Sequence, residues 1–276
     1  MTIKEAFTMM ETVLPEAKHE VIWLLEKATE IPASQLRIKT DDFVIAPDAA
    51  QGFEQMLKRR QRHEPLQYIF GQWEFMGLPM LCRPGVLIPR SDTELLATEA
   101  IRFLQNSAKN PVALDLCTGS GCVGIALAHF CPGARVCLSD IDPAALELAR
   151  DNARLNGVYD SLDFIQSDLF TEINERFHCI TANPPYIPTA EIQGLQEEVK
   201  MEPVLALDGG ADGLDFYRAI IPECRKYLKA KGCLFLEVGA EQGKVVADML
   251  RYHGFRAVAM IKDLEDRYRV LRGISI

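Results

Sequence analysis

The chain has 276 residues, of which 48% are hydrophobic and 25% charged, so it can bury a sizeable core as one large domain or two smaller ones. Its formal net charge of −9 at pH 7 argues against broad, sequence-independent binding of nucleic acid, although a local basic patch is not excluded. The eight cysteines form no Cys-x-x-Cys pair and the five histidines show no ligand spacing, which disfavours structural zinc and a disulfide framework and fits a reducing cytoplasm.

The first part of the chain, residues 1–64, is predicted to be a small helical domain. Apolar residues recur at helical spacing before Pro15 and again before Pro32, and Pro47 begins a third helix. The start lacks the apolar stretch of a signal peptide, and no apolar run approaches the ~18 residues of a membrane helix. The basic run at residues 58–63 is either a solvated helix end or a contact for an acidic or RNA partner, and we favour the helix end.

Residues 65–90 change character. Stretches of β-forming residues around Tyr68 and Trp73 alternate with glycines and prolines, which predicts a β-hairpin connecting the helical part to the rest. Ser91 and Glu94 are spaced as a capping box, so a helix is expected to follow. Arg90 lies beside the N-terminus of this helix, and the two together would stabilise a bound carboxylate group.

From residue 111 the pattern is strand, helix, strand. Val112–Leu116 is predicted as a buried strand, and residues 117–121 as a turn whose glycines, Gly119 and Gly121, let the backbone approach a ligand closely. The second strand ends in Asp140, 21 residues after Gly119, and an acid at this spacing suits the hydroxyls of a ribose. Together these features indicate a cofactor that contains adenosine.

Two more predicted strands end in polar residues. The third, 163–166, is followed by Asp168 and Leu169, which either contact an adenine ring or form a simple strand-end turn. The fourth, 177–182, is followed by Asn183-Pro184-Pro185-Tyr186. Because prolines have no N–H and restrict the backbone, this loop is stiff and offers carbonyl acceptors but few donors. It therefore suits a substrate whose reacting group is an NH2, with Tyr186 packing on a planar amide or base; the alternative is a turn that only ends the strand.

The remainder of the chain completes an α/β pattern. Residues 187–211 show weak periodicity, and a connection of this length is usually a lid or a binding loop. Beyond it we predict a helix, a strand, another helix and two final strands that pair as an antiparallel hairpin at the far end of the sheet, over residues 212–229, 233–238, 241–252, 255–261 and 268–273.

The assembled motifs resemble class I S-adenosylmethionine-dependent methyltransferases. Asp115-x-Cys117-Thr118-Gly119-Ser120-Gly121 is similar to their first motif, Asp140 to their ribose acid, and Asn183-Pro184-Pro185-Tyr186 to the loop of enzymes that methylate planar nitrogens. Arg62–Tyr68, Leu87–Glu94 and Glu202–Leu214 resemble the release-factor glutamine methyltransferases, the PrmC/HemK family. The resemblance implies a Rossmann-like, seven-stranded, mostly parallel sheet over residues 91–276, joined by the hairpin at 65–90 to a helical, substrate-recognising domain at 1–64.

The same resemblance implies methylation of the N5 amide of the glutamine in the Gly-Gly-Gln motif of peptide chain release factors. It implies S-adenosyl-L-methionine as cofactor, no metal, no direct contact with nucleic acid or membrane, and a cytoplasmic monomer. The catalytic residues would be Asn183, Pro184, Pro185 and Tyr186. The cofactor-binding residues would be Cys117, Thr118, Gly119, Ser120, Gly121, Asp140, Asp168, Leu169, Asn183 and Arg90.

An amide nitrogen is a poor nucleophile, so the loop is expected to act by orientation. The Asn183 side-chain carbonyl and the Pro184 backbone carbonyl would each accept one amide hydrogen and stabilise positive charge developing on nitrogen. Three other interpretations stay open: a glutamine methyltransferase of ribosomal protein L3, an adenine-N6 methyltransferase of nucleic acid, and a non-catalytic cofactor-binding protein.

Two positions depart from the family pattern. Cys117 stands where many methyltransferases have glycine, and we expect a negative φ there, since a left-handed cysteine would be strained. Ser91 replaces the usual proline and is expected to act as the N-cap of the following helix.

Overall fold

The computed structural model describes all 276 residues and divides into two compact units, Met1–Phe70 and Gly71–Ile276. The division falls after Phe70 and not at residue 64, because Leu66–Phe70 forms a short helix, α5, whose Leu66 and Ile69 are buried in the core of the first unit. The prediction of strand-like structure around Tyr68 is therefore wrong. Packing of one apolar face has overridden the β-propensity of this stretch.

The first unit is helical, as the periodicity predicts. Its elements are α1 Ile3–Val13, the 3-10 helix η1 Pro15–Glu20, α2 Val21–Thr29, α3 Ala33–Leu36, α4 Pro47–Arg60 and α5 Leu66–Phe70. Two arginines of the basic run at the end of α4 form ion pairs within this unit. Arg60 forms a buried ion pair with Glu20 at 2.7 Å, and Arg59 pairs with Glu64. These contacts favour the structural interpretation of the run.

The second unit begins with an antiparallel hairpin, β1 Gln72–Phe75 and β2 Leu78–Leu81. A seven-stranded sheet follows in the order β5-β4-β3-β6-β7-β9-β8. Its strands are β3 Val112–Leu116, β4 Arg135–Asp140, β5 Leu162–Gln166, β6 Phe177–Ala182, β7 Leu228–Glu237, β8 Arg256–Lys262 and β9 Tyr268–Ile274. All pairs from β5 to β7 are parallel, whereas β9 runs antiparallel to both neighbours. The predicted antiparallel pair at the end of the sheet is confirmed.

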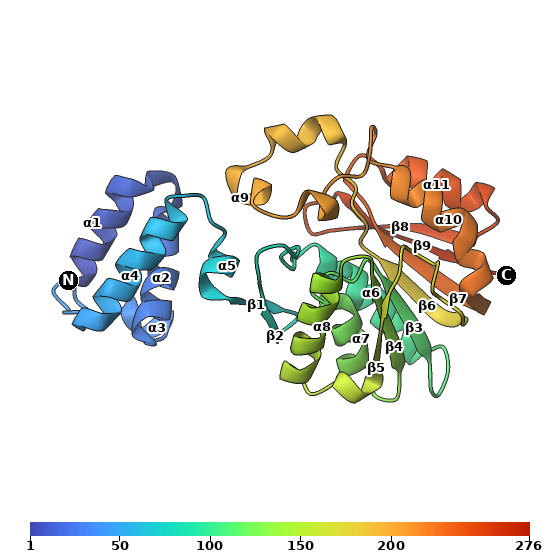
Figure 1. Ribbon diagram of the computed structural model, residues 1–276, viewed down its shortest axis with the longest axis horizontal. Coiled ribbons are helices and arrows are strands. Elements are labelled where there is room, and N and C mark those ends of the chain that lie inside the picture. Colours follow the sequence, from blue (N-terminus) through green and yellow to red (C-terminus); the bar gives the residue numbers. More distant parts are fainter. The chain divides into compact units, whose positions relative to one another are not determined.

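Helices cover both faces of this sheet (Figure 1). One face carries α6 Thr93–Gln105, α7 Cys122–Phe130 and α8 Pro143–Leu155, and the other carries α10 Asp215–Tyr227 and α11 Gly243–Tyr252. Two separate apolar clusters, one on each face, hold these layers together. With both faces covered, the central strands are largely apolar, which is why the sequence shows them as short apolar runs.

The start of α6 differs from the prediction. The residue before the helix is Asp92, not Ser91, and its side chain makes no capping bond. Glu94 does not complete a capping box, because its carboxylate accepts the backbone N–H of Met76 at 2.8 Å. Because Glu94 bonds to the hairpin, it is not available for the capping box that the local sequence predicts. By contrast, Asp142 caps α8 with its own side chain, accepting from the Ala144 N–H at 2.8 Å.

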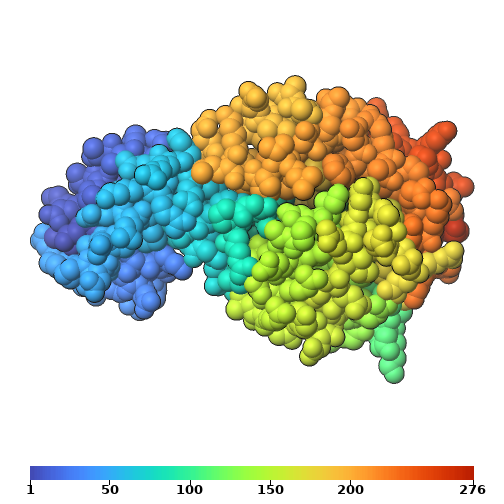
Figure 2. Space-filling model, in the orientation of Figure 1, coloured from blue at the N-terminus to red at the C-terminus, as the bar shows by residue number.

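The segment after β6 contains only short helical turns, η3 Thr189–Gly194, α9 Glu197–Lys200 and η4 Val204–Ala206. Its two ends are tied together, since Ile187 N–H donates to Leu207 O at 3.0 Å and Gly209 N–H donates to Ile187 O at 2.8 Å. Figure 2 shows its surface, in gold and orange, bordering that of the β4–β5 region, in green. No helix in the chain combines the length and apolar character needed to cross a bilayer.

Candidate active site

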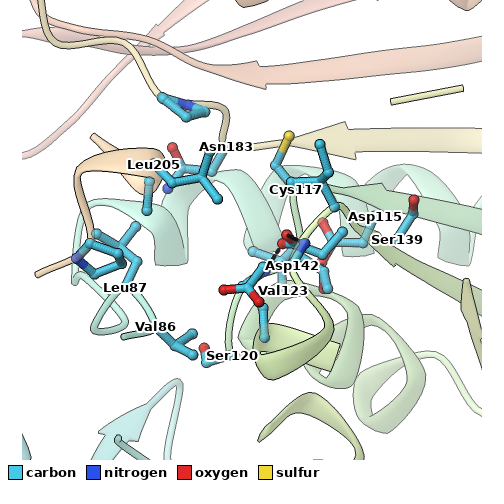
Figure 3. A pocket seen from close by; sticks show the side chains of 18 of the residues that line it. Val86, Leu87, Asp115, Cys117, Ser120, Val123, Ser139, Asp142, Asn183 and Leu205 are labelled. Carbon is cyan, nitrogen blue, oxygen red and sulfur yellow. Dashed lines mark hydrogen bonds between the residues drawn. The ribbon is translucent and has the colours of Figure 1, made fainter. Parts of the chain in front are cut away.

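A cavity of about 190 Å³ lies at the carboxyl ends of β3, β4, β5 and β6. Figure 3 shows Asn183, Leu205 and Leu87 along one side of it and Cys117, Asp115 and Ser139 along the other. Open α/β sheets bind ligands at this edge. Ten of the predicted site residues line the cavity: Arg90, Cys117, Thr118, Gly119, Ser120, Asp140, Asp168, Leu169, Asn183 and Pro185. Gly121, Pro184 and Tyr186 do not line it.

The turn after β3 is held from beneath by Asp115. Its buried carboxylate accepts the Thr118 hydroxyl at 2.6 Å, the Gly124 N–H at 3.1 Å and the Thr181 hydroxyl at 2.7 Å. Burial raises the pKa of Asp115 to about 6. Because one carboxylate joins the turn, the start of α7 and strand β6, the floor of the cavity is a single rigid piece.

The backbone of the turn is left-handed at three positions. Gly119 has φ 54° and Gly121 has φ 82°, which glycine adopts without strain. Cys117 has φ 55°, so the expectation of a negative φ there is wrong. The chain reverses directly after β3 so that the Thr118 N–H reaches Ser139 O on β4 at 3.0 Å, and this reversal places Cys117 in the left-handed region. Burial raises the pKa of its thiol, which therefore stays protonated.

Gly121 serves packing and not the cavity. A Cβ at this position would lie 2.9 Å from the Cβ of Ala149 on α8, closer than side chains pack. The glycine thus allows the turn to rest directly on α8. At Gly119 the situation is the opposite, because no heavy atom lies within 4 Å of where a Cβ would stand. Gly119 therefore faces open space inside the cavity.

Asp140, the last residue of β4, organises the other half of the turn. One of its oxygens accepts the Gly119 N–H at 2.8 Å and the other accepts the Asp142 N–H at 3.0 Å. Burial raises its pKa above the ordinary value of an aspartate. Each carboxylate oxygen accepts more than one hydrogen bond, so Asp140 can still receive hydroxyl donors from a ligand in the cavity.

The loop after β6 is fixed by groups that the sequence did not single out. The side-chain N–H of Asn183 donates to the Thr93 hydroxyl at 3.1 Å, and the Gln242 side chain donates to the Tyr186 backbone carbonyl at 2.8 Å. Gly209 packs so closely that a Cβ there would lie 2.7 Å from Tyr186 Cα and 2.9 Å from the Pro185 carbonyl oxygen. Burial raises the pKa of Tyr186 to about 12, so its phenol stays neutral.

Arg90 lies at the cavity wall, but its positive charge is already paired with a carboxylate of this chain. Its guanidinium pairs with Glu202, whose buried carboxylate also accepts the Ile88 N–H at 2.9 Å. This pair fastens the segment after β6 to the residues just before α6. No group of three or more His, Cys, Asp or Glu side chains is placed to hold a metal ion.

The fold and the site together define a class of protein. A sheet with five parallel strands and a terminal antiparallel pair, a glycine turn after its first strand and an acid after its second, is the class I methyltransferase architecture. Comparison with known proteins agrees. A profile described as the methyltransferase small domain matches residues 93–199, and one described as the PrmC N-terminal domain matches residues 3–71.

Curated relatives identify the family. The chain is 42% identical to the release factor glutamine methyltransferase of Moorella thermoacetica over 82% of its own length and 80% of the relative's. It is 39% identical to that of Geobacter sulfurreducens over 96% and 92% of the two lengths. The chain belongs to the release factor glutamine methyltransferases. Among solved structures, a methyltransferase from Pyrococcus furiosus shares the fold with a TM-score of 0.55 at 18% identity, covering 73% of this chain and 91% of the other.

Proposed function

We propose that this enzyme transfers a methyl group from S-adenosyl-L-methionine to the side-chain amide nitrogen of the glutamine in the Gly-Gly-Gln motif of peptide chain release factors. The observation that carries the proposal is the position of Asn183. Its side chain is anchored at the wall of the cavity, in a proline-stiffened loop, in a chain that matches release factor glutamine methyltransferases over nearly its whole length.

The cavity residues fit the cofactor. Gly119 opens the turn onto free space, Asp140 presents carboxylate oxygens suited to ribose hydroxyls, and Asp168 and Leu169 lie beside them in the wall. These groups would hold the adenosine part. When bound, S-adenosylmethionine supplies an electrophilic methyl group carried by a sulfonium.

The chain's own contribution to the reaction is orientation. With its N–H groups turned to Thr93, Asn183 keeps a carbonyl oxygen with which to accept one hydrogen of the substrate amide. We assign the second acceptor to the backbone carbonyl of Pro184. Two fixed acceptors hold the nitrogen in one direction and place negative dipoles where positive charge develops, so no general base is needed. Tyr186, neutral and packed against one of the apolar clusters of the unit, supports the loop.

The first unit is assigned to recognition of the protein substrate. It has its own core, it lacks any of the cavity residues, and the matching profile covers the same part of the chain as this unit. We further propose that the enzyme works in the cytoplasm as a monomer and contacts no nucleic acid directly, in keeping with its net charge of −9.

The test is transfer of a labelled methyl group to purified candidate substrates. Intact release factor should be labelled, and release factor whose Gly-Gly-Gln glutamine is replaced by glutamate should not. Ribosomal protein L3 and adenine-containing duplex DNA serve as competing substrates in parallel reactions. Preferential labelling of either competitor would overturn the proposed substrate.

A further inference from the structure

A buried acid stands directly behind the Asn183 loop. Glu237 is the last residue of β7, the strand beside β6, and the register pairs Ala182 with Leu236. Asn183 and Glu237 each follow these paired residues, so the sheet itself places them side by side. Glu237 is only 1% exposed, although burying a carboxylate is costly.

The side chains of Thr93 and Asn183 lie beside the Glu237 carboxyl group. Their interaction with it lowers the pKa of Glu237, against the larger, opposite effect of burial. Asn183 in turn donates its side-chain N–H to the Thr93 hydroxyl at 3.1 Å. Since that hydroxyl accepts from Asn183, its own proton is available for Glu237. An ionised carboxylate accepts only, so both neighbours must direct donors toward it.

This arrangement decides which way the Asn183 amide faces. An ionised carboxylate on one side requires the NH2 group on that side, because it can only accept. If the amide were reversed, its carbonyl oxygen would face this carboxylate, and the bond that Asn183 donates to Thr93 would be lost. The network therefore keeps Oδ1 of Asn183 turned away from Thr93, as the acceptor that the proposed reaction needs.

The surroundings set the charge of Glu237. Burial, with a smaller contribution from Asp92 at the start of α6, raises its pKa to about 7, against the opposing effects of Thr93, Asn183 and Arg269 of β9. Arg269 is itself engaged by Asp92 at 3.1 Å and by Asp263 at 3.7 Å. The Tyr217 hydroxyl of α10 donates to the Glu237 backbone carbonyl at 2.9 Å. In addition to burial, the charge of Glu237 raises the pKa of Tyr186 and that of Cys122 on α7.

Two buried side-chain atoms in the chain lack a hydrogen-bond partner, Oε2 of Glu237 and Nε of Arg269. Both belong to this cluster. A carboxylate retained here with one oxygen unsatisfied is poorly explained by stability alone, because an apolar side chain of the same size would avoid the desolvation cost. We therefore look for the role of Glu237 in the neighbours of its other oxygen, Oε1.

We propose that Glu237 is a positioning residue for methyl transfer, which in its ionised form holds the Asn183 side-chain amide, directly and through Thr93, with Oδ1 presented to the substrate amide. The proposal rests on the proposed function for its kinetic consequence. The orientation of Asn183 itself is a property of the enzyme alone and can be measured without substrate.

The kinetic test compares Glu237→Met with Glu237→Gln. Methionine has similar length and removes the acceptor, so single-turnover methyl transfer should slow by at least about tenfold while cofactor affinity changes less than about threefold. Glutamine keeps one acceptor without the charge and should fall between. Thr93→Val should resemble Glu237→Met, and Thr93→Ser, which restores the hydroxyl, should recover most of the loss. A folded Glu237→Met enzyme within about threefold of the parent rate would overturn the proposal.

The pH dependence gives a second, independent outcome that holds even if Glu237→Met does not fold. The parent rate should rise with pH and level off above about 7, the value to which burial raises the Glu237 pKa, and Glu237→Gln should lack this step. In the absence of substrate, the Asn183 side-chain NH2 resonances, assigned by their loss in Asn183→Ala, should titrate with the same midpoint in the parent and stay constant in Glu237→Gln. An unchanged titration in Glu237→Gln contradicts the positioning role, whereas absence of release-factor methylation in the parent contradicts only the proposed function.

Discussion

Replacing Gly209 by alanine should displace the Asn183 loop by a definable amount. The added Cβ would stand 2.7 Å from Tyr186 Cα and 2.9 Å from both Gly213 Cα and the Pro185 carbonyl oxygen. All three are backbone atoms. An ordinary contact begins at 3.4 Å, so the backbone must move by 3.4 − 2.7 = 0.7 Å. Neither side yields freely, because Gly209 is hydrogen-bonded to Ile187 at 2.8 Å.

The expected cost has two parts. Overpacking of this kind destabilises a protein by about 1–3 kcal/mol. Displacing reacting groups by about 1 Å costs up to ~10²-fold in rate, so a shift of this size should slow methyl transfer by at least about tenfold. Gly194→Ala is the matched control, since it lies in the same segment, has no positive φ and has no heavy atom within 4 Å of its Cβ position.

Denaturant unfolding and single-turnover transfer at saturating cofactor measure the two parts separately. Gly194→Ala should match the parent in both. If Gly209→Ala also matches it in rate and stability, then Gly209 does not set the position of the loop and the reasoning from close packing fails.

Three further changes probe other parts of the enzyme. Asp140→Ala should weaken cofactor binding by about 1–3 kcal/mol, because it removes a charged acceptor and also leaves the Gly119 N–H without its partner, and calorimetry on the folded variant would detect this. A chain beginning at Gly71 should still bind cofactor but no longer methylate intact release factor; a full rate would refute the recognition role of the first unit. Glu237→Gln should change how stability depends on pH. The native pKa of Glu237 is raised from its ordinary 4.5 to about 7, so the native state binds a proton that the unfolded state releases, and the parent should lose up to about 3 kcal/mol as pH rises between these values. Unfolding midpoints from pH 4 to 8 should show a smaller loss in Glu237→Gln, and identical curves would exclude the titration of this group.

The features that sequence reasoning predicted correctly are local ones. The turn at residues 117–121, the acid at Asp140 and the loop at Asn183 each follow a buried strand whose apolar run is short and continuous. Parallel strands bring their carboxyl ends to one edge, so the three segments had to meet there.

The features that were missed depend on contacts between distant segments. Thr93 and Asn183 lie 90 positions apart, and nothing near either residue indicates the hydrogen bond between them. The cap expected from Ser91 and Glu94 does not form, because the Glu94 carboxylate accepts a hydrogen bond from the β1–β2 hairpin instead. The negative φ expected at Cys117 is not found, because the chain reverses there to reach β4. Glu237 carried one usable signal, an acid directly after the apolar run Cys233–Leu236. In a sheet buried on both faces, such a residue requires a partner and therefore indicates a polar network.

The central claim is that the Asn183 side chain orients the substrate amide, and Asn183→Ala tests it most directly. The substitution removes the acceptor while leaving the proline-stiffened backbone in place. With cofactor and release factor both saturating, single-turnover transfer should slow by at least about a hundredfold, the scale of losing one preorganised polar group. Cofactor affinity should change much less, and Asn174→Ala, at an exposed asparagine outside the cavity, should behave as the parent. A folded Asn183→Ala enzyme that keeps most of its transfer rate would contradict the account, because backbone carbonyls and proximity would then suffice for the reaction.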